Sequence, residues 1–169
     1  MIYDRALHNQ FLQLVFSRTT CLKIIIKKSL MKSINLIAVI IAAVAAFVLG
    51  FLFHGPVAGK LWMELANIHP TGNEKFKDII PQMLWNLLIQ FVTAFVLAVI
   101  YSFASSSPYI GGKGILGGVI LGTWIWFGFL VTSSSVEVIW MGRNYKLWLF
   151  EVVSSLIVMV TMGAIIAGW

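Results

Sequence analysis

Four long apolar segments, separated by polar stretches, dominate the chain. They run from about Ile34 to Phe53, Leu84 to Ala104, Ile115 to Val136 and Leu147 to Gly168. A helix of about 20 residues crosses the hydrocarbon core of a bilayer, so each segment is long enough to span. Because each run is continuously apolar, without the alternation of a barrel strand, we expect helices. The pattern predicts an all-α, polytopic integral membrane protein, a bundle of four transmembrane helices.

An even number of spans places both ends of the chain on one side of the membrane, here called side A. The segments 54–83 and 137–146 then lie on the opposite side, side B. Residues that break helices fall between the predicted spans, at Gly55-Pro56, Pro70, Pro81, Pro108 and Gly142. These breaks support the same boundaries.

The composition of the chain also indicates that it resides in a lipid bilayer. Apolar residues make up 60% of the chain and charged residues 11%, against about 45–50% and about 25% in soluble domains. The net charge of +6 favours contact with lipid headgroups over nucleic acid, because no nucleic-acid recognition motif accompanies it. The single cysteine, Cys21, cannot form an internal disulfide.

Polar residues inside the spans gather in their side-B halves. Asn86 and Gln90 share one face of the second span at helical spacing, and Glu151 lies near the start of the fourth. Polar groups are costly in a bilayer and therefore informative. We predict a polar vestibule that opens to side B, lined by His54, Asn86, Gln90, Thr132, Ser134, Glu151 and Ser155.

Structural roles for the same residues stay open beside this prediction. Glu151 is close enough to the interface to snorkel, and the start of a helix stabilises a carboxylate. The alternatives for Glu151 are binding of a proton or cation and contact with a partner. Asn86 and Gln90 also suit hydrogen bonds between helices. His54 suits an interfacial position, or a pairing with Glu137 or Glu151 that would respond to pH near neutrality.

Small residues at four-residue spacing mark the faces on which helices can approach closely. The first and third spans carry such faces, and the fourth carries Gly163 and Ala167. The pattern does not decide whether these faces pack within one chain or between chains. The predicted packing positions are Ala42, Ala46, Gly50, Gly114, Gly118 and Gly122.

Motifs for catalysis and for cofactors are missing from the sequence. The run from Gly111 to Gly114 lacks the Ser or Thr of a phosphate loop, and neither serine run sits in a nucleophile elbow. The histidines His8, His54 and His69 have no zinc-site spacing. We therefore expect no enzyme activity, no metal and no cofactor.

From Met31 onward the chain resembles the bacterial membrane family known as domain of unknown function 1761. The resemblance lies in the opening 34–39, in Gly50 through Gly55-Pro56 and 59–63, in 117–129 with Gly142-Arg143, and in the ending 163–169. It covers about residues 31–169. It implies a four-helix fold in the bacterial inner membrane and brings no activity with it.

The segment 1–30 differs from the rest of the chain, since it mixes basic residues with apolar patches too short to span. We expect it to be a basic N-terminal extension that is translated from upstream of a true start at Met31. The alternative is an amphipathic helix at the membrane surface. The membrane domain is then 31–169.

Orientation depends on that start, because cytoplasmic loops carry an excess of Lys and Arg. Side B carries Lys60, Lys75, Lys77, Arg143 and Lys146, whereas side A carries Lys113 and, from Met31, Lys32. We therefore expect 54–83 and 137–146 to be cytoplasmic. A start at Met1 would add Arg5, Arg18, Lys23, Lys27 and Lys28 to side A and reverse the bias.

Two functions fit these features. The first is a non-enzymatic helper or binding subunit, which holds another membrane protein or a lipid. The second is a small homo-oligomeric transporter or channel that uses the one-sided vestibule. The side-A halves offer few polar residues, so the first function is favoured.

Overall fold

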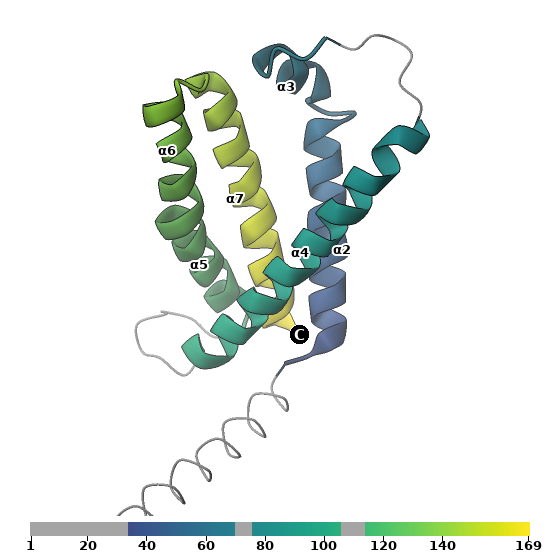
Figure 1. Ribbon diagram of the computed structural model, residues 1–169. Coiled ribbons are helices and arrows are strands. Elements are labelled where there is room, and N and C mark those ends of the chain that lie inside the picture. Colours follow the sequence, from purple (N-terminus) through teal and green to yellow (C-terminus); the bar gives the residue numbers. More distant parts are fainter. Residues whose placement is uncertain (1–33, 70–75, 106–113) are drawn as a thin grey trace, which may run out of the picture. The chain divides into compact units, whose positions relative to one another are not determined.

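The computed structural model describes residues 34–69, 76–105 and 114–169, and Asn35–Trp169 form one compact unit (Figure 1). Four helices are long and apolar enough to cross a membrane: Leu36–His54, Ile79–Ala104, Ile115–Met141 and Tyr145–Gly168. The predicted all-helical fold class is confirmed. The segment 1–30, where we expect an N-terminal extension, lies outside the described residues.

The first span, α2 (Leu36–His54), starts at a side-chain cap. The Asn35 carboxamide oxygen accepts the backbone N–H of Ile37 at 3.0 Å and that of Ala38 at 3.4 Å. This satisfies two of the N–H groups that a helix start leaves without partners. The helix ends where Gly55-Pro56 begins, as the breakers predict.

A short helix, α3 (Gly59–Leu65), follows α2 at the side-B end. Asn67 after it has φ 55°, in the left-handed region that asparagine tolerates better than most residues. The Asn144 amide donates to the carbonyl of Leu65 at 3.3 Å. This bond ties α3 to the start of α7, the last helix.

The second span belongs to α4 (Phe76–Ala104), which contains Pro81. The sequence predicted a break at Pro81 and a span from about Leu84, whereas the helix continues on both sides of the proline. A proline near a helix start removes one hydrogen bond, to the carbonyl four residues before it. That loss is tolerated here, so the apolar helix runs from Ile79 to Ala104.

The third span is one continuous rod of three parts: α5 (Ile115–Ile125), the π-helix η2 (Trp126–Val131) and α6 (Thr132–Met141). It extends to Met141, beyond the predicted end near Val136, because its serine run continues the helix. Gly142 then stops it with φ 64°, a left-handed conformation that suits glycine.

Hydroxyl side chains that follow the π-helix bond back to it. Thr132, Ser133, Ser134 and Ser135 donate to the carbonyls of Gly128, Phe129, Leu130 and Val131, respectively, at 2.5–2.7 Å. The wider turn of a π-helix disturbs the regular pattern of backbone bonds. Four consecutive hydroxyls therefore give extra donors to the carbonyls at this point.

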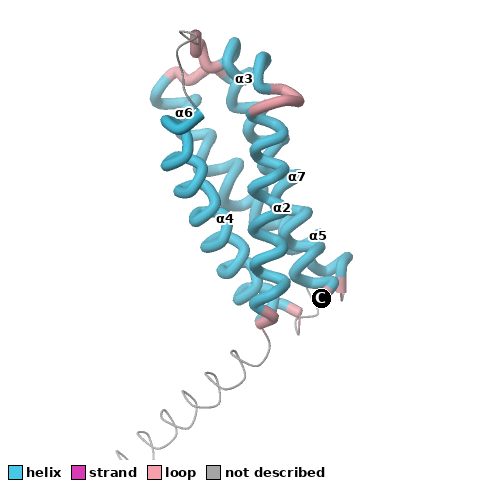
Figure 2. Tube along the Cα trace, turned by 90° about the vertical axis from the view of Figure 1, so that its right-hand side faces the viewer, coloured by secondary structure: helices cyan, strands magenta, loops and turns pink. Residues whose placement is uncertain are grey.

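The last span, α7 (Tyr145–Gly168), starts at Asn144, whose side chain accepts the backbone N–H of Lys146 at 3.0 Å. It makes its most extensive contact with α5, and it also packs on α2 and α4. Figures 1 and 2 show α3 and the turn between α6 and α7 at one end, side B, with the C-terminus at the other, side A.

Most of the buried core lies in the side-A half. The buried residues of α2 and α4 there are mainly alanines, at Ala38, Ala42, Ala43, Ala46, Ala94 and Ala98. On α5 and α7 the tight contact is made by glycine. A Cβ on Gly118 would overlap the carbonyl oxygen of Gly163, and one on Gly122 would lie 2.7 Å from the Met159 oxygen. Small residues thus bring the helices together at this end.

The predicted packing positions divide into two groups. Ala42, Ala46, Gly118 and Gly122 are buried at helix contacts. Gly50 and Gly114 have open space where a Cβ would stand. Gly114 precedes α5 with φ 65°, so its role is to turn the chain into the helix. Gly50 faces the pocket described next.

Candidate functional site

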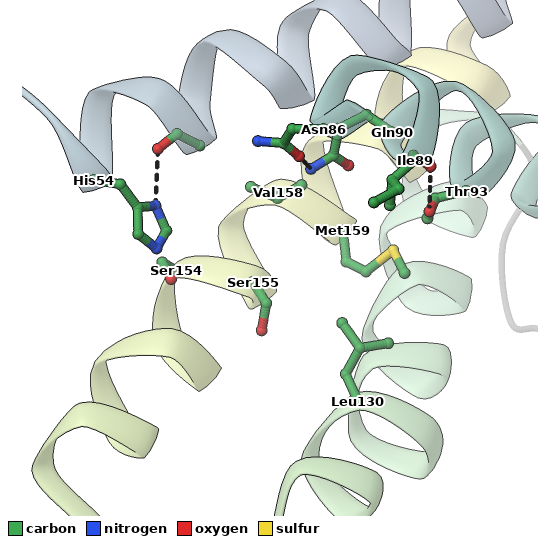
Figure 3. Close-up of a pocket in the computed structure, with 11 residues that line it drawn as sticks. His54, Asn86, Ile89, Gln90, Thr93, Leu130, Ser154, Ser155, Val158 and Met159 are labelled. Atoms are coloured by element: carbon green, nitrogen blue, oxygen red, sulfur yellow. Dashed lines mark hydrogen bonds between the residues drawn. The ribbon is translucent and has the colours of Figure 1, made fainter. Parts of the chain in front are cut away.

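A pocket of about 310 Å³ lies in the side-B half, between α2, α4, α7 and the π-helix (Figure 3). Its size is at the lower end of the range for small-molecule sites. It lies toward side B from the tight glycine contacts between α5 and α7. The pocket is lined by Gly50, His54, Asn86, Ile89, Gln90, Thr93, Leu130, Ser154, Ser155, Val158 and Met159.

Three hydroxyl groups of the lining bond to their own helices. Thr93 donates to the carbonyl of Ile89 at 2.9 Å, and Ser154 and Ser155 donate to the carbonyls of Glu151 and Val152 at 3.0 and 2.9 Å. Such back-bonding is how a helix accommodates Ser and Thr in an apolar setting. Each hydroxyl hydrogen is therefore used, and the oxygen lone pairs remain for other donors.

The two carboxamides of the lining bond to each other. Gln90 donates to the side-chain oxygen of Asn86 at 3.4 Å, one helical turn away. Exchange of O and N in both groups would preserve this bond. In either arrangement one carboxamide oxygen and one NH₂ group stay unused by the pair.

His54 is held in place by three neighbours. Its Nδ1 lies 2.9 Å from the carbonyl oxygen of Gly50. A carbonyl can only accept, so Nδ1 carries the hydrogen. The ring also makes edge contacts with Trp62 of α3 and Phe150 of α7, at centroid distances of 5.3 and 5.9 Å. His54 thus joins α3 and α7 at the side-B end of the pocket lining.

Trp126, the first residue of the π-helix, bonds to α7 beside the pocket lining. Its indole N–H donates to the carbonyl of Val152 at 2.9 Å and to the Ser155 hydroxyl at 3.2 Å. An indole N–H in an apolar surrounding needs such a partner. Trp124, two residues earlier, is 64% exposed in the isolated chain and turns outward.

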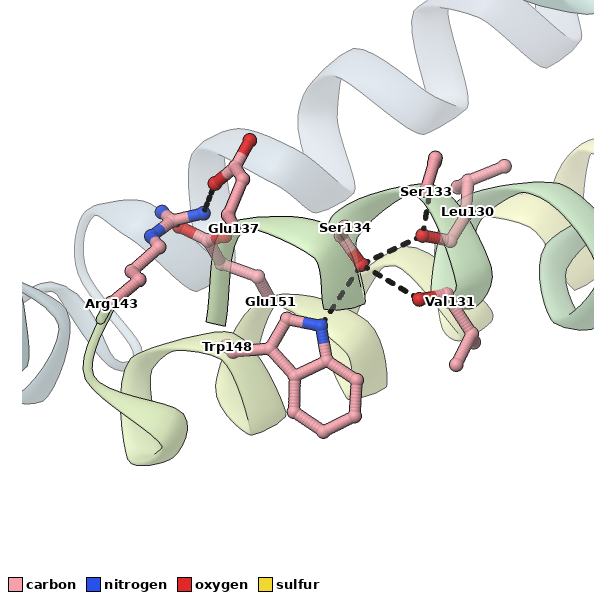
Figure 4. A network of polar contacts seen from close by, with 8 residues as sticks. All are labelled: Leu130, Val131, Ser133, Ser134, Glu137, Arg143, Trp148 and Glu151. Atoms are coloured by element: carbon pink, nitrogen blue, oxygen red, sulfur yellow. Dashed lines mark hydrogen bonds and ion pairs between the residues drawn. The ribbon is translucent and has the colours of Figure 1, made fainter. Parts of the chain in front are cut away.

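The structure brings four of the predicted vestibule residues to this pocket: His54, Asn86, Gln90 and Ser155. Thr132, Ser134 and Glu151 lie elsewhere. The Thr132 hydroxyl is directed at its own helix. The Ser134 hydroxyl also accepts the indole N–H of Trp148 at 2.9 Å (Figure 4). These two hydroxyls therefore join α6 to the π-helix, and that of Ser134 also joins it to α7.

Glu151 is bound in an ion-pair network at the turn between α6 and α7. Arg143 contacts Glu137 at 2.5 Å and Glu151 at 2.6 Å (Figure 4). The sequence offered His54 as a partner for these acids, whereas the guanidinium takes both. Gly142 turns the chain so that Arg143 lies between the two helices. Neither carboxylate lines the pocket.

The predicted vestibule left out two polar members of the lining, Thr93 and Ser154. Thr93 has the same helical phase as Gln90, and this signal was present in the sequence. Ser154 carried a weaker signal, because two adjacent serines point in different directions. The apolar members Ile89, Leu130, Val158 and Met159 have no signal that separates them from ordinary packing residues.

The described residues contain no group of three or more His, Cys, Asp or Glu placed to hold a metal ion. The pocket also has no Lys, Arg, Asp or Glu among its lining residues. Its chemistry is that of hydroxyl, carboxamide and imidazole groups beside apolar side chains. Such a surface can bind through hydrogen bonds and apolar contact.

No curated protein and no solved structure matches this chain. One family does match, over residues 37–167, which cover the four spans except for the first residue of the first and the last residue of the fourth. The match agrees with the resemblance in the glycine and tryptophan motifs of the sequence. The chain belongs to the family described as protein of unknown function (DUF1761).

Proposed function

We propose that this protein is a non-enzymatic binding subunit of the membrane, which holds another membrane protein or a lipid at its side-B half. The observation that carries the proposal is the pocket itself. Six polar side chains from three helices converge on about 310 Å³ of space. Polar groups in a bilayer are costly, and bound partners would offset that cost.

The packing of the side-A half supports binding over passage. Ala42, Ala94 and Met162 are fully buried there, each with 0% exposure. Gly118 and Gly163 bring the backbones of α5 and α7 into contact. A substrate that entered the pocket from side B would therefore meet close-packed residues on the way to side A.

The hydroxyl groups support a non-catalytic role. A serine nucleophile needs a base that takes its hydrogen. Ser154, Ser155 and Thr93 instead donate to backbone carbonyls of their own helices.

We also propose that the protein is a multi-pass protein of the cell membrane, with 54–83 and 137–146 in the cytoplasm. The excess of Lys and Arg in these segments supports this orientation. A reporter enzyme that works only outside the cytoplasm should then be active when it is fused after Trp169. A cytoplasmic reporter would reverse the orientation and leave the pocket proposal intact.

Native mass spectrometry on the full chain, extracted gently from its own membrane, tests the binding proposal. The wild type should carry a partner at fixed stoichiometry, and Gln90→Leu should release it. Gln82→Leu is the matched control, because it makes the same change on the same helix outside the pocket lining. Equal occupancy of all three proteins would contradict the proposal.

The second candidate is a small homo-oligomeric transporter or channel. The reach of the polar lining favours it, because Ser154 is nine residues into α7 and thus roughly 14 Å along its axis. A path across the membrane would then need surfaces from several copies. Arrival as a defined homo-oligomer without a partner, together with flux that Gln90→Leu abolishes, would favour transport.

A further inference from the structure

The hydrogen-bonding groups of the pocket are biased toward acceptors. The hydroxyls of Thr93 and Ser154 have donated their only hydrogens to Ile89 and Glu151 carbonyls, so toward the pocket they can only accept. Because the His54 ring directs Nδ1 at the Gly50 carbonyl, Nε2 is the ring nitrogen left for a ligand, and it accepts whenever the imidazole is uncharged. A molecule that fits these groups must donate hydrogen bonds.

The carboxamide pair adds one acceptor and one donor group. Because Gln90 and Asn86 share a single bond, a carboxamide oxygen and an NH₂ group remain for a ligand. A hydroxyl group suits this mixture, since it donates one hydrogen bond and accepts others. A carboxylate or phosphate does not suit it, because anions only accept.

The pocket also lacks charge. The lining contains no Lys, Arg, Asp or Glu, and Arg143 already pairs with both Glu137 and Glu151. A charged ligand would stand unpaired in a surrounding of low dielectric constant, which is strongly unfavourable. The group that binds is therefore uncharged.

The rest of the wall is apolar, formed by Ile89, Leu130, Val158 and Met159. Within the described part of the chain, α4 packs on α2, α7 and α5, without comparable contact to the π-helix or α6. The π-helix and α4 both line the pocket without packing extensively on each other, so we place its opening to the bilayer between them. An acyl chain attached to a bound polar group can leave through this opening.

We infer that the pocket binds an uncharged, hydroxyl-bearing headgroup with an apolar tail, the chemistry of a neutral glycerolipid. The same hydroxyl chemistry could come from a free polyol. The inference rests on the proposed binding function and names the class of ligand for it. Hydroxyl hydrogens meet Thr93, Ser154 and His54, the carboxamides complete the head site, and the tail lies along Ile89 and Leu130.

Equilibrium binding to the full chain in phosphatidylcholine nanodiscs tests this inference. The probe is radiolabelled monooleoylglycerol. The comparison is oleoyl lysophosphatidate, which has the same tail and glycerol and adds a phosphate. Competition with free glycerol distinguishes a lipid from a free polyol as the ligand. If glycerol at modest excess displaces the labelled monooleoylglycerol, the ligand is a polyol; if the labelled lipid stays bound, the ligand is a glycerolipid.

Monooleoylglycerol should bind, and lysophosphatidate should bind about 10-fold or more weakly, because its charge is unpaired. Thr93→Val keeps the shape of the side chain and removes one acceptor, so it should weaken monooleoylglycerol by about 3- to 10-fold. Gln90→Leu should weaken it by at least as much, whereas the control Gln82→Leu should bind like wild type. Unchanged thermal unfolding of the variants excludes misfolding as the cause.

Equal or tighter binding of lysophosphatidate would overturn the inference, as would wild-type affinity in Thr93→Val. The mass spectrometry described above separates this failure from failure of the proposed function. A protein or anionic lipid that Gln90→Leu releases keeps the binding function and overturns this ligand class. If the wild type and Gln90→Leu carry the same bound molecules at the same occupancy, both the ligand class and the proposed binding function are overturned.

Discussion

The contact between α5 and α7 allows a quantitative test, because the two backbones meet at Gly118 and Gly163. A Cβ on Gly118 would overlap the carbonyl oxygen of Gly163 and lie 2.5 Å from the Ala167 Cβ. Carbon atoms in good contact are about 3.5–4.0 Å apart. Gly118→Ala therefore forces the two helices apart by about 1 Å.

The size of the effect follows from two opposing contributions. Overpacking costs about 1–3 kcal/mol, and this site belongs at the upper end because the obstacle is backbone. Alanine in place of glycine within a helix returns at most about 1 kcal/mol. The free energy of unfolding should therefore fall by about 2 kcal/mol.

Reversible unfolding by SDS in mixed micelles, followed by circular dichroism, measures this change. Gly128→Ala is the matched control, since Gly128 lies in the same rod with no atom within 4 Å of the added Cβ. Alanine there should leave stability unchanged or raise it slightly. The packing argument is refuted when Gly118→Ala proves as stable as Gly128→Ala.

Three further changes can be followed with the same unfolding assay. Arg143→Met removes both ion pairs, but the side chains are 30–46% exposed, so the free energy of unfolding should fall by about 1 kcal/mol. Arg143→Lys should restore part of this loss. Equal stability of the Met and Lys variants would count against the ion-pair network. Trp126→Phe removes the indole hydrogen bonds to α7 and should lower the free energy of unfolding by about 1 kcal/mol, whereas Trp124→Phe should change it little. Equal losses in the two variants would show that these hydrogen bonds do not stabilise the fold. Asn35→Ala removes the side-chain cap of α2 and should lower the free energy of unfolding by about 1 kcal/mol. Asn35→Asp should keep the cap and the stability. Wild-type stability of Asn35→Ala would show that the cap does not stabilise the protein.

The number and kind of spans could be predicted because an apolar helix satisfies its own backbone in a bilayer. The ends of the spans were harder to predict from the sequence. Pro81 predicted a break, yet a single missing hydrogen bond near a helix start does not stop α4. The serine run 133–135 looked like the end of a span, yet its hydroxyls bond to the π-helix and let α6 continue to Met141.

The side-B location of polar residues and the shared face of Asn86 and Gln90 could be derived from helical phase. The grouping of residues from different helices could not, because it depends on tilt and on turns. The position of Glu151 is one example. Its partner Arg143 is placed by the left-handed Gly142, and no periodicity in the sequence encodes that turn.

The small residues explain why the pocket lies where it does. Ala42 and Ala46 of α2, with Gly118 and Gly122 of α5, let the helices meet in the side-A half. Toward side B the face of the third span continues with the larger Trp126 and Leu130, which leaves the helices farther apart, whereas the face of α2 continues with Gly50, beside open space in the pocket lining. The packing pattern and the pocket are therefore two consequences of one distribution of residue sizes.

The most direct test of the account is to capture what occupies the pocket in the native membrane. A diazirine analogue of leucine is placed at Leu130, an apolar residue of the pocket lining, in the full chain, and at the exposed Leu116 of α5 as control, and living cells are irradiated. Binding in the pocket predicts a discrete adduct, one lipid or one protein, at position 130 and only diffuse products at position 116. The same mixture of bulk lipids at both positions would contradict the proposal that this pocket is a binding site.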